Sequence, residues 1–187
     1  MASVVEPMTP AVARPRVLAR WVTGFYRLLG GLACVAMVAA FVSIALGVIA
    51  RTFGLNIPGL DAYAGYSIAA ALFLALPMTF RQGDHIRVTL FLDKLPAKAR
   101  TVLEYWSLIA GLALSLYMAY FSCRLVWISH LVHDVSSGAD ATPLWIPQMA
   151  MALGCIGFAL SLADALLARW QGRKFFVSAA DEVSRVE

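Results

Sequence analysis

Charged residues are scarce in this sequence and are missing from the middle of four long apolar stretches. Asp, Glu, Lys and Arg make up 14% of its 187 residues, whereas 61% are hydrophobic. A soluble domain is about 25% charged and about 45–50% apolar, and a chain of this length has too little interior to bury such an excess of apolar surface. The sequence therefore predicts an integral membrane protein.

The missing groups also exclude several kinds of membrane chemistry. An ionisable side chain at the centre of a spanning helix costs roughly 2.5–3.5 kcal/mol, so such groups are usually retained only for function. Their absence here argues against a proton antiporter with an embedded carboxylate and against an intramembrane protease. All three histidines are placed in loops (His85, His130 and His133), which argues against a haem-anchoring subunit. We expect no enzyme, no catalytic residue and no metal site.

The three cysteines form no Cys-x-x-Cys motif and have no histidine at a metal-ligand spacing. Without paired loop cysteines, the chain lacks the groups that a disulfide-exchanging membrane protein needs. We expect Cys34, Cys123 and Cys155 to be small, buried, apolar side chains.

What is present is four stretches suited to cross a bilayer, at about 28–50, 62–80, 105–128 and 144–166. A helix of the first length spans about 35 Å, and the hydrocarbon core is about 30 Å thick. In lipid the backbone must satisfy its own hydrogen bonds, so each stretch is predicted to be a helix. The prediction is an all-α, integral membrane four-helix bundle, a single domain over 14–170 with tails at 1–13 and 171–187.

The basic residues predict the orientation. Thirteen of the fifteen Lys and Arg residues precede the first stretch, lie between the second and third, or follow the fourth. The other two connections hold one each, Arg51 and Arg124. By the positive-inside rule, both termini and the loop 81–104 are predicted to be cytoplasmic. Asp61, Arg124 and Asp164 are expected at helix ends, where their side chains reach water.

Two segments have the pattern of amphipathic helices lying on the membrane surface. Residues 14–27 place apolar side chains on one face and arginines on the other, and Pro15 suits a first turn. In the loop 81–104, four apolar residues recur at helical spacing before Pro96: Val88, Phe91, Leu92 and Leu95. Each segment is interpreted as a membrane anchor or as a brace that holds a partner subunit.

Small residues recur at four-residue spacing along every stretch. The rows are Ala39, Ser43 and Gly47; Gly65 and Ala69, which extend a row beginning at Asp61; Gly111, Ser115, Ala119 and Cys123; and Gly157, Ser161 and Ala165. Small side chains let helix backbones approach closely in a membrane. Two interpretations remain open, namely packing within the bundle and contact with another protein.

Two loops carry distinctive sequences. After the second stretch, the segment Arg81-Gln-Gly-Asp-His-Ile-Arg-Val88 combines a turn glycine with clustered charge, and its structural candidates are Arg81, Gly83, His85 and Arg87. Before the fourth stretch, the segment Asp140-Ala-Thr-Pro-Leu-Trp-Ile-Pro147 combines prolines near a helix start with an interfacial tryptophan. With Asp61 and Gly65, its residues Thr142, Pro143, Trp145 and Pro147 are candidates for a partner interface.

These loops, together with Asp61 at the start of the second stretch, resemble the small membrane subunit of tripartite ATP-independent periplasmic (TRAP) transporters, the DctQ-like family. The matching motifs are Arg81-x-Gly-x-His-Ile-Arg-Val88 and Thr142-Pro-Leu-Trp-Ile-Pro147, and the likeness runs from about Arg20 to about Trp170. Family members often carry two adjacent acidic residues at the start of the second helix, whereas here Ala62 follows Asp61.

The resemblance implies a multi-pass subunit of the bacterial cell inner membrane with no cofactor of its own. Its partners would be a separate large membrane subunit, which binds substrate and sodium, and a periplasmic solute-binding protein that delivers an organic acid. The small subunit would brace the large one and help to dock the binding protein during sodium symport. No nucleic acid is expected as a partner, because topology accounts for the basic charge.

Two other functions remain possible from the sequence. One is a stand-alone channel or carrier that works as a homo-oligomer, which the uncharged helix centres argue against. The other is a membrane anchor subunit of an unrelated complex, which the absence of histidine from the stretches weakens. The genes that flank this one would separate the three hypotheses.

Overall fold

Four long helices make up the regular structure of the described chain. The computed structural model describes residues 16–55, 57–82, 96–138 and 140–171. Its helices are α1 (Arg16–Thr52), α2 (Leu60–Gln82), α4 (Ala97–Leu131) and α5 (Trp145–Trp170). Each is long and apolar enough to cross a membrane. The predicted all-α protein with four spanning helices is therefore confirmed.

The helices extend beyond the uncharged stretches, because the backbone hydrogen bonds of a helix continue until a helix-breaking residue such as proline or glycine. No proline occurs between Arg16 and Thr52, so the described part of the expected interfacial segment, residues 16–27, forms the beginning of α1 instead of a separate helix. The helix ends before Gly54, which adopts a φ of 70°. The second expected amphipathic segment, from Val88 to Leu95, lies outside the described residues.

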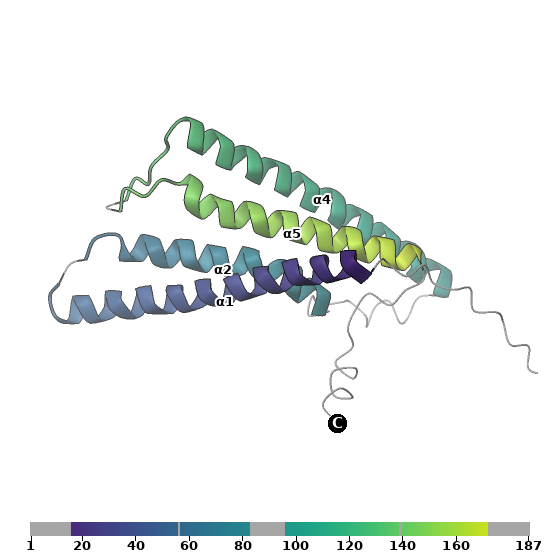
Figure 1. Ribbon diagram of the computed structural model, residues 1–187, viewed down its shortest axis with the longest axis horizontal. Coiled ribbons are helices and arrows are strands. Elements are labelled where there is room, and N and C mark those ends of the chain that lie inside the picture. Colours follow the sequence, from purple (N-terminus) through teal and green to yellow (C-terminus); the bar gives the residue numbers. More distant parts are fainter. Residues whose placement is uncertain (1–15, 56, 83–95, 139, 172–187) are drawn as a thin grey trace, which may run out of the picture.

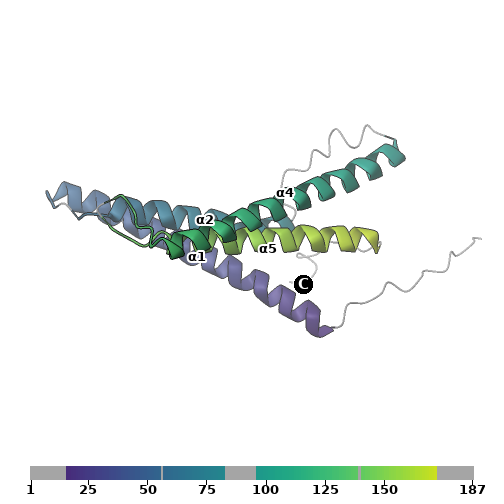
Figure 2. The ribbon, with the colours of Figure 1, turned by 90° about the horizontal axis from the view of Figure 1, so that it is seen from above.

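The helices lie side by side in the order α1, α2, α5, α4 (Figure 1). The central pair α2 and α5 each pack against two neighbours, whereas α1 packs mainly against α2 and α4 against α5. Seen from above, α1 and α4 diverge on either side of α5 (Figure 2). We call the end that holds the α1–α2 turn and the α4–α5 loop the turn end, and the opposite end the terminal end.

Small residues form the seam between α1 and α2. From its middle onward, the buried or half-buried side chains of α1 are all small. Apart from Ala45, they recur at alternating spacings of three and four: Ala33, Ala36, Ala40, Ser43, Gly47 and Ala50. This seven-residue repeat is typical of helices that supercoil around each other. The larger apolar side chains of α1 are left on the outside, among them Val38 and Phe41.

The backbones of α5 and α2 approach closely beside the proline of α2. Pro77 is fully buried and has no N–H to donate to the carbonyl of Phe73, four residues earlier. A Cβ atom at Gly154 would overlap that carbonyl, and one at Gly157 would lie 2.7 Å from the Pro77 ring. Glycine at these two positions therefore allows the two backbones to meet.

The rows of small residues divide between the two interpretations. Gly157, Ser161 and Ala165 are all buried, so this row packs within the protein. Gly65 and Ala69 are exposed, and no atom lies within 4 Å of a Cβ placed at Gly65. In the row on α1, Ser43 and Gly47 pack in the seam with α2, while Ala39 is exposed. In the row on α4, Ser115 and Ala119 are buried and Gly111 is half-buried, while Cys123 is exposed.

The expectation that all three cysteines are buried is wrong for two of them. Cys155 is buried in α5, but Cys34 and Cys123 are exposed on α1 and α4. The reason is the open order of the helices, because α1 and α4 each have one face without a neighbouring helix.

Candidate functional site

Two segments predicted to contact partners, Asp61 with Gly65 and the region 142–147, lie at the turn end (Figure 1). They are distant in sequence, but both stand at or near the start of a helix that runs away from this end. The structure therefore gathers them on one face of the molecule, and hydrogen bonds connect the two segments through neighbouring residues.

Asp140 is the centre of this connection. Its Oδ1 accepts a hydrogen bond of 2.9 Å from the Ser136 hydroxyl, and its Oδ2 accepts one of 3.2 Å from the Tyr66 hydroxyl of α2. The backbone N–H of Thr142 donates to the same Oδ2 at 3.4 Å. Gly59 passes so close that a Cβ there would lie 2.9 Å from the Cβ of Asp140. One carboxylate thus joins the α4–α5 loop to α2.

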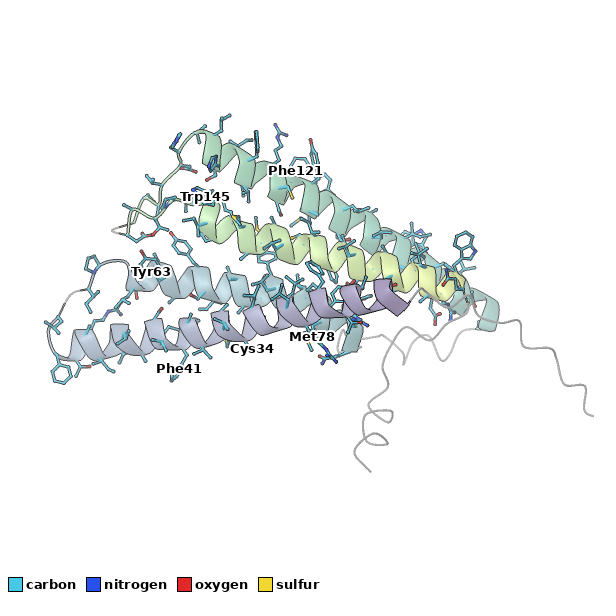
Figure 3. The ribbon with its side chains drawn as sticks, in the orientation of Figure 1. Cys34, Phe41, Tyr63, Met78, Phe121 and Trp145 are labelled. Atoms are coloured by element: carbon cyan, nitrogen blue, oxygen red, sulfur yellow. The ribbon has the colours of Figure 1, made fainter. Side chains whose placement is uncertain are left out.

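A second contact between the same elements involves Thr142. Its hydroxyl lies at hydrogen-bonding distance, 3.2 Å, from the Tyr63 hydroxyl, and the Tyr63 and Tyr66 rings meet edge to face. Figure 3 shows Tyr63 reaching from α2 toward the loop that leads to Trp145. Tyr63, Tyr66 and Ser136 were not predicted as site residues. The sequence feature that could have indicated the two tyrosines is their spacing, because it places two hydroxyls three residues apart in the first turns of an otherwise apolar helix.

Hydrogen bonding lowers the pKa of the Asp140 carboxyl below its ordinary value of 3.8. The side chain of Thr142 is the largest cause, the Ser136 hydroxyl adds to it, and partial burial acts in the opposite direction. Asp140 is therefore ionised at neutral pH, as an acceptor of several hydrogen bonds should be.

The α4–α5 loop is itself a compact structure. An isolated antiparallel bridge pairs Val135 with Pro143. The N–H of Ser136 donates to the carbonyl of Thr142 at 2.9 Å, and the N–H of Leu144 to the carbonyl of Asp134 at 3.0 Å. These bonds hold Pro143 exposed at the surface of the molecule.

Trp145 and Pro147 belong to the first turn of α5, where a missing backbone N–H is harmless. The Trp145 ring meets the His130 ring edge to face, with 5.4 Å between the ring centroids. His130 was predicted to lie in a loop, which is wrong because α4 continues to Leu131. Trp145 thus packs against the last turn of α4.

Asp61 forms an ion pair at the edge of the turn end. An Nη atom of Arg51 lies 2.8 and 2.6 Å from its two carboxylate oxygens, across the α1–α2 turn. Both side chains are largely exposed, so this pair contributes little to stability. With the exposed Gly65 one turn further along α2, Asp61 remains accessible to another protein.

At the terminal end, Arg81 is the described member of the predicted loop cluster. Its guanidinium lies 4.7 Å from the centre of the Tyr26 ring, which is buried in α1. Gly83, His85 and Arg87 lie outside the described residues. Across the molecule, Arg169 of α5 pairs with Glu104 of α4.

Within the described ranges, no three His, Cys, Asp or Glu side chains lie close enough together to hold a metal ion. The side chains that hydrogen bonds bring together at the turn end are the hydroxyls of Tyr63, Tyr66, Ser136 and Thr142 and the carboxylate of Asp140.

The comparison with family models matches residues 40–172, from the middle of α1 to just beyond α5. The matching family is described as "Tripartite ATP-independent periplasmic transporters, DctQ component". The comparison with curated proteins found no match.

Proposed function

Because the chain belongs to the DctQ family of tripartite ATP-independent periplasmic transporters, we propose that it is the scaffold subunit of a sodium-coupled importer of organic acids. It is a multi-pass membrane protein and a transporter component. In the proposal it lies in a bacterial inner membrane, supports the large membrane subunit and helps the periplasmic binding protein to dock. The family match is the observation that carries this proposal.

The side chains buried between the helices favour a scaffold function for this chain over a transport path through it. Among the described residues no charged side chain is buried; besides Tyr26, the buried polar side chains are Ser115, Ser122, Ser129 and Ser161, and Gln148 has a buried Oε1 atom. A path for sodium and a carboxylate through the chain would need charged or oxygen-rich groups between the helices. We therefore assign substrate, sodium and their coupling to the large subunit.

The turn end supports the docking part of the proposal. If the basic terminal end is cytoplasmic, the turn end faces the periplasm, where a binding protein would approach. The contacts of Asp140 with Ser136 and Tyr66 hold its loop in one shape, so little flexibility would be lost on docking.

Reconstitution into liposomes tests the proposal. We expect uptake of labelled succinate or labelled sialic acid, driven by a sodium gradient with the binding protein outside, only when this chain and the large subunit are both present. Uptake by this chain alone, or ion conductance by its homo-oligomer, would overturn the proposal. Undiminished uptake by the large subunit alone would also overturn it.

A further inference from the structure

The outer face of α4 carries polar groups that have no partner in the described chain. This Arg124 face consists of Tyr117, Tyr120, Phe121, Arg124 and Trp127, all exposed. It lies opposite the seam of Ser115, Ala119 and Ser122, which is buried. No described residue forms a hydrogen bond or ion pair with Arg124 or with the hydroxyls of Tyr117 and Tyr120.

Arg124 is not at the end of α4, as the sequence suggested, but about two turns before it. The helix continues for seven residues beyond it to Leu131, which is about 10 Å. The Ser122 hydroxyl lies 3.7 Å from the Cys155 sulfur, and Cys155 is midway between Trp145 and Asp164 on α5. Arg124 follows Ser122 by two residues, so its backbone is near the level of the middle of the uncharged part of α5.

The helix direction makes it harder for Arg124 to reach water. Side chains on a helix lean toward the helix N-terminus. For α4 that direction runs from the nearer turn end toward the terminal end, over the turn that holds Tyr120 and Phe121. Arginines within spanning helices normally face protein or a water-filled cavity and are paired. Facing lipid, Arg124 would be left unpaired.

Arginines at three helix ends show the contrast, because each contacts a group within the chain. The pairs are Arg51 with Asp61, Arg81 with Tyr26, and Arg169 with Glu104. The other outer helix also differs. Its outward side chains include Val38 and Phe41, and the sequence from 28 to 50 contains no charge. The outer face of α1 is therefore suited to lipid tails, whereas the Arg124 face is not.

We propose that the Arg124 face binds a spanning helix of the large membrane subunit, and that a carboxylate of this helix pairs with Arg124. This inference rests on the proposed function and names the surface through which the scaffold acts. An Asp or Glu at this depth supplies the charge that Arg124 lacks, and the pair is strong where water is excluded. The exposed tyrosine hydroxyls supply further donors beside it.

Photo-crosslinking distinguishes the two outer helices. The probe is p-benzoylphenylalanine, placed at Tyr120 on α4 or at Phe41 on α1. Tyr120 and Phe41 are matched aromatic positions, 63% and 72% exposed, and Phe41 and Phe121 mark the two outward directions (Figure 3). In membranes that contain all the subunits, we expect a crosslink to the large subunit from position 120 alone. Equal crosslinking from position 41, or a crosslink from 120 to lipid only or to a second copy of this chain, would overturn the inference.

Substitution of Arg124 tests the charge separately from folding. Removing a charge from a spanning helix favours membrane insertion, so Arg124→Leu should reach the membrane at least as well as the wild-type chain. We nevertheless expect this variant to recover about tenfold less large subunit on purification, because the partner carboxylate is left unpaired. Recovery equal to wild type would contradict the pairing.

The wild-type control separates the two levels of failure. If the wild-type chain captures no large membrane subunit, the proposed function fails. If it captures that subunit while position 41 crosslinks and Arg124→Leu has no effect, only the assignment of the Arg124 face fails.

Discussion

The backbone carbonyl of Phe73 in α2 lies against Gly154 of α5, with no room for a Cβ atom between the two helices. The proline one turn further along α2 cannot donate a hydrogen bond to this carbonyl, and the absence of a side chain at position 154 lets α5 approach it. The central pair of helices thus meets at a point set by one missing N–H and one missing Cβ.

Gly154→Ala is therefore predicted to destabilise the protein although alanine favours helices. The added Cβ would overlap backbone that cannot rotate away, and such overpacking costs about 1–3 kcal/mol. The matched control is Gly65→Ala, where the Cβ enters open space and helix propensity favours alanine by up to about 1 kcal/mol. Thermal unfolding in detergent should give a lower midpoint for the first variant only. Equal midpoints for both variants would contradict the close contact.

Tyr66→Phe is predicted to loosen the α4–α5 loop from α2. The substitution keeps the ring but removes the hydroxyl that donates to Asp140. Tyr120→Phe is the control, because that hydroxyl has no hydrogen bond within the described part of the isolated subunit. Limited proteolysis of the loop should be faster for Tyr66→Phe and unchanged for Tyr120→Phe. A loop equally protected in both variants would rule out a role for this hydrogen bond.

Acid should weaken the same contact. Folding lowers the pKa of the Asp140 carboxyl below 3.8, so the unfolded chain binds this proton more readily. The stabilisation is complete above the unfolded pKa and is lost as the pH falls through the lowered folded pKa. Asp140→Asn should lack this component of the pH dependence. Proteolysis of the loop at graded acidic pH, with an acid-active protease, measures it, and identical profiles for both proteins would refute it.

Gly59→Ala should be more harmful than Gly54→Ala. Both glycines have a positive φ, 88° and 70°, which costs an alanine about 1–2 kcal/mol. Only the Cβ at position 59 also meets Asp140, whereas position 54 is open. The difference between the two midpoints of thermal unfolding isolates the contact between the α1–α2 turn and the loop. If Gly54→Ala proved the more harmful, that contact would be unsupported.

Much of the fold could be predicted because lipid sets the length and polarity of a spanning helix. Four uncharged stretches with flanking charge predicted four helices, and the motifs around Arg81 and Thr142 indicated the family that the comparison confirms. The contacts of Asp140 with Tyr66 and of Gly154 with Phe73 could not be predicted. Each joins segments that are distant in sequence, and hydropathy does not indicate which helices become neighbours.

What the sequence by itself determined is the number of crossings and the family, since both depend on local composition and motifs. Only the tertiary structure decided the helix order α1, α2, α5, α4, and with it that Ala40 faces a neighbour while Arg124 faces outward. The physical reason is that lipid tails and helix surfaces are equally apolar, so hydrophobicity does not select the face that packs. Steric fit between small residues selects it, and that fit exists only once the helices are together.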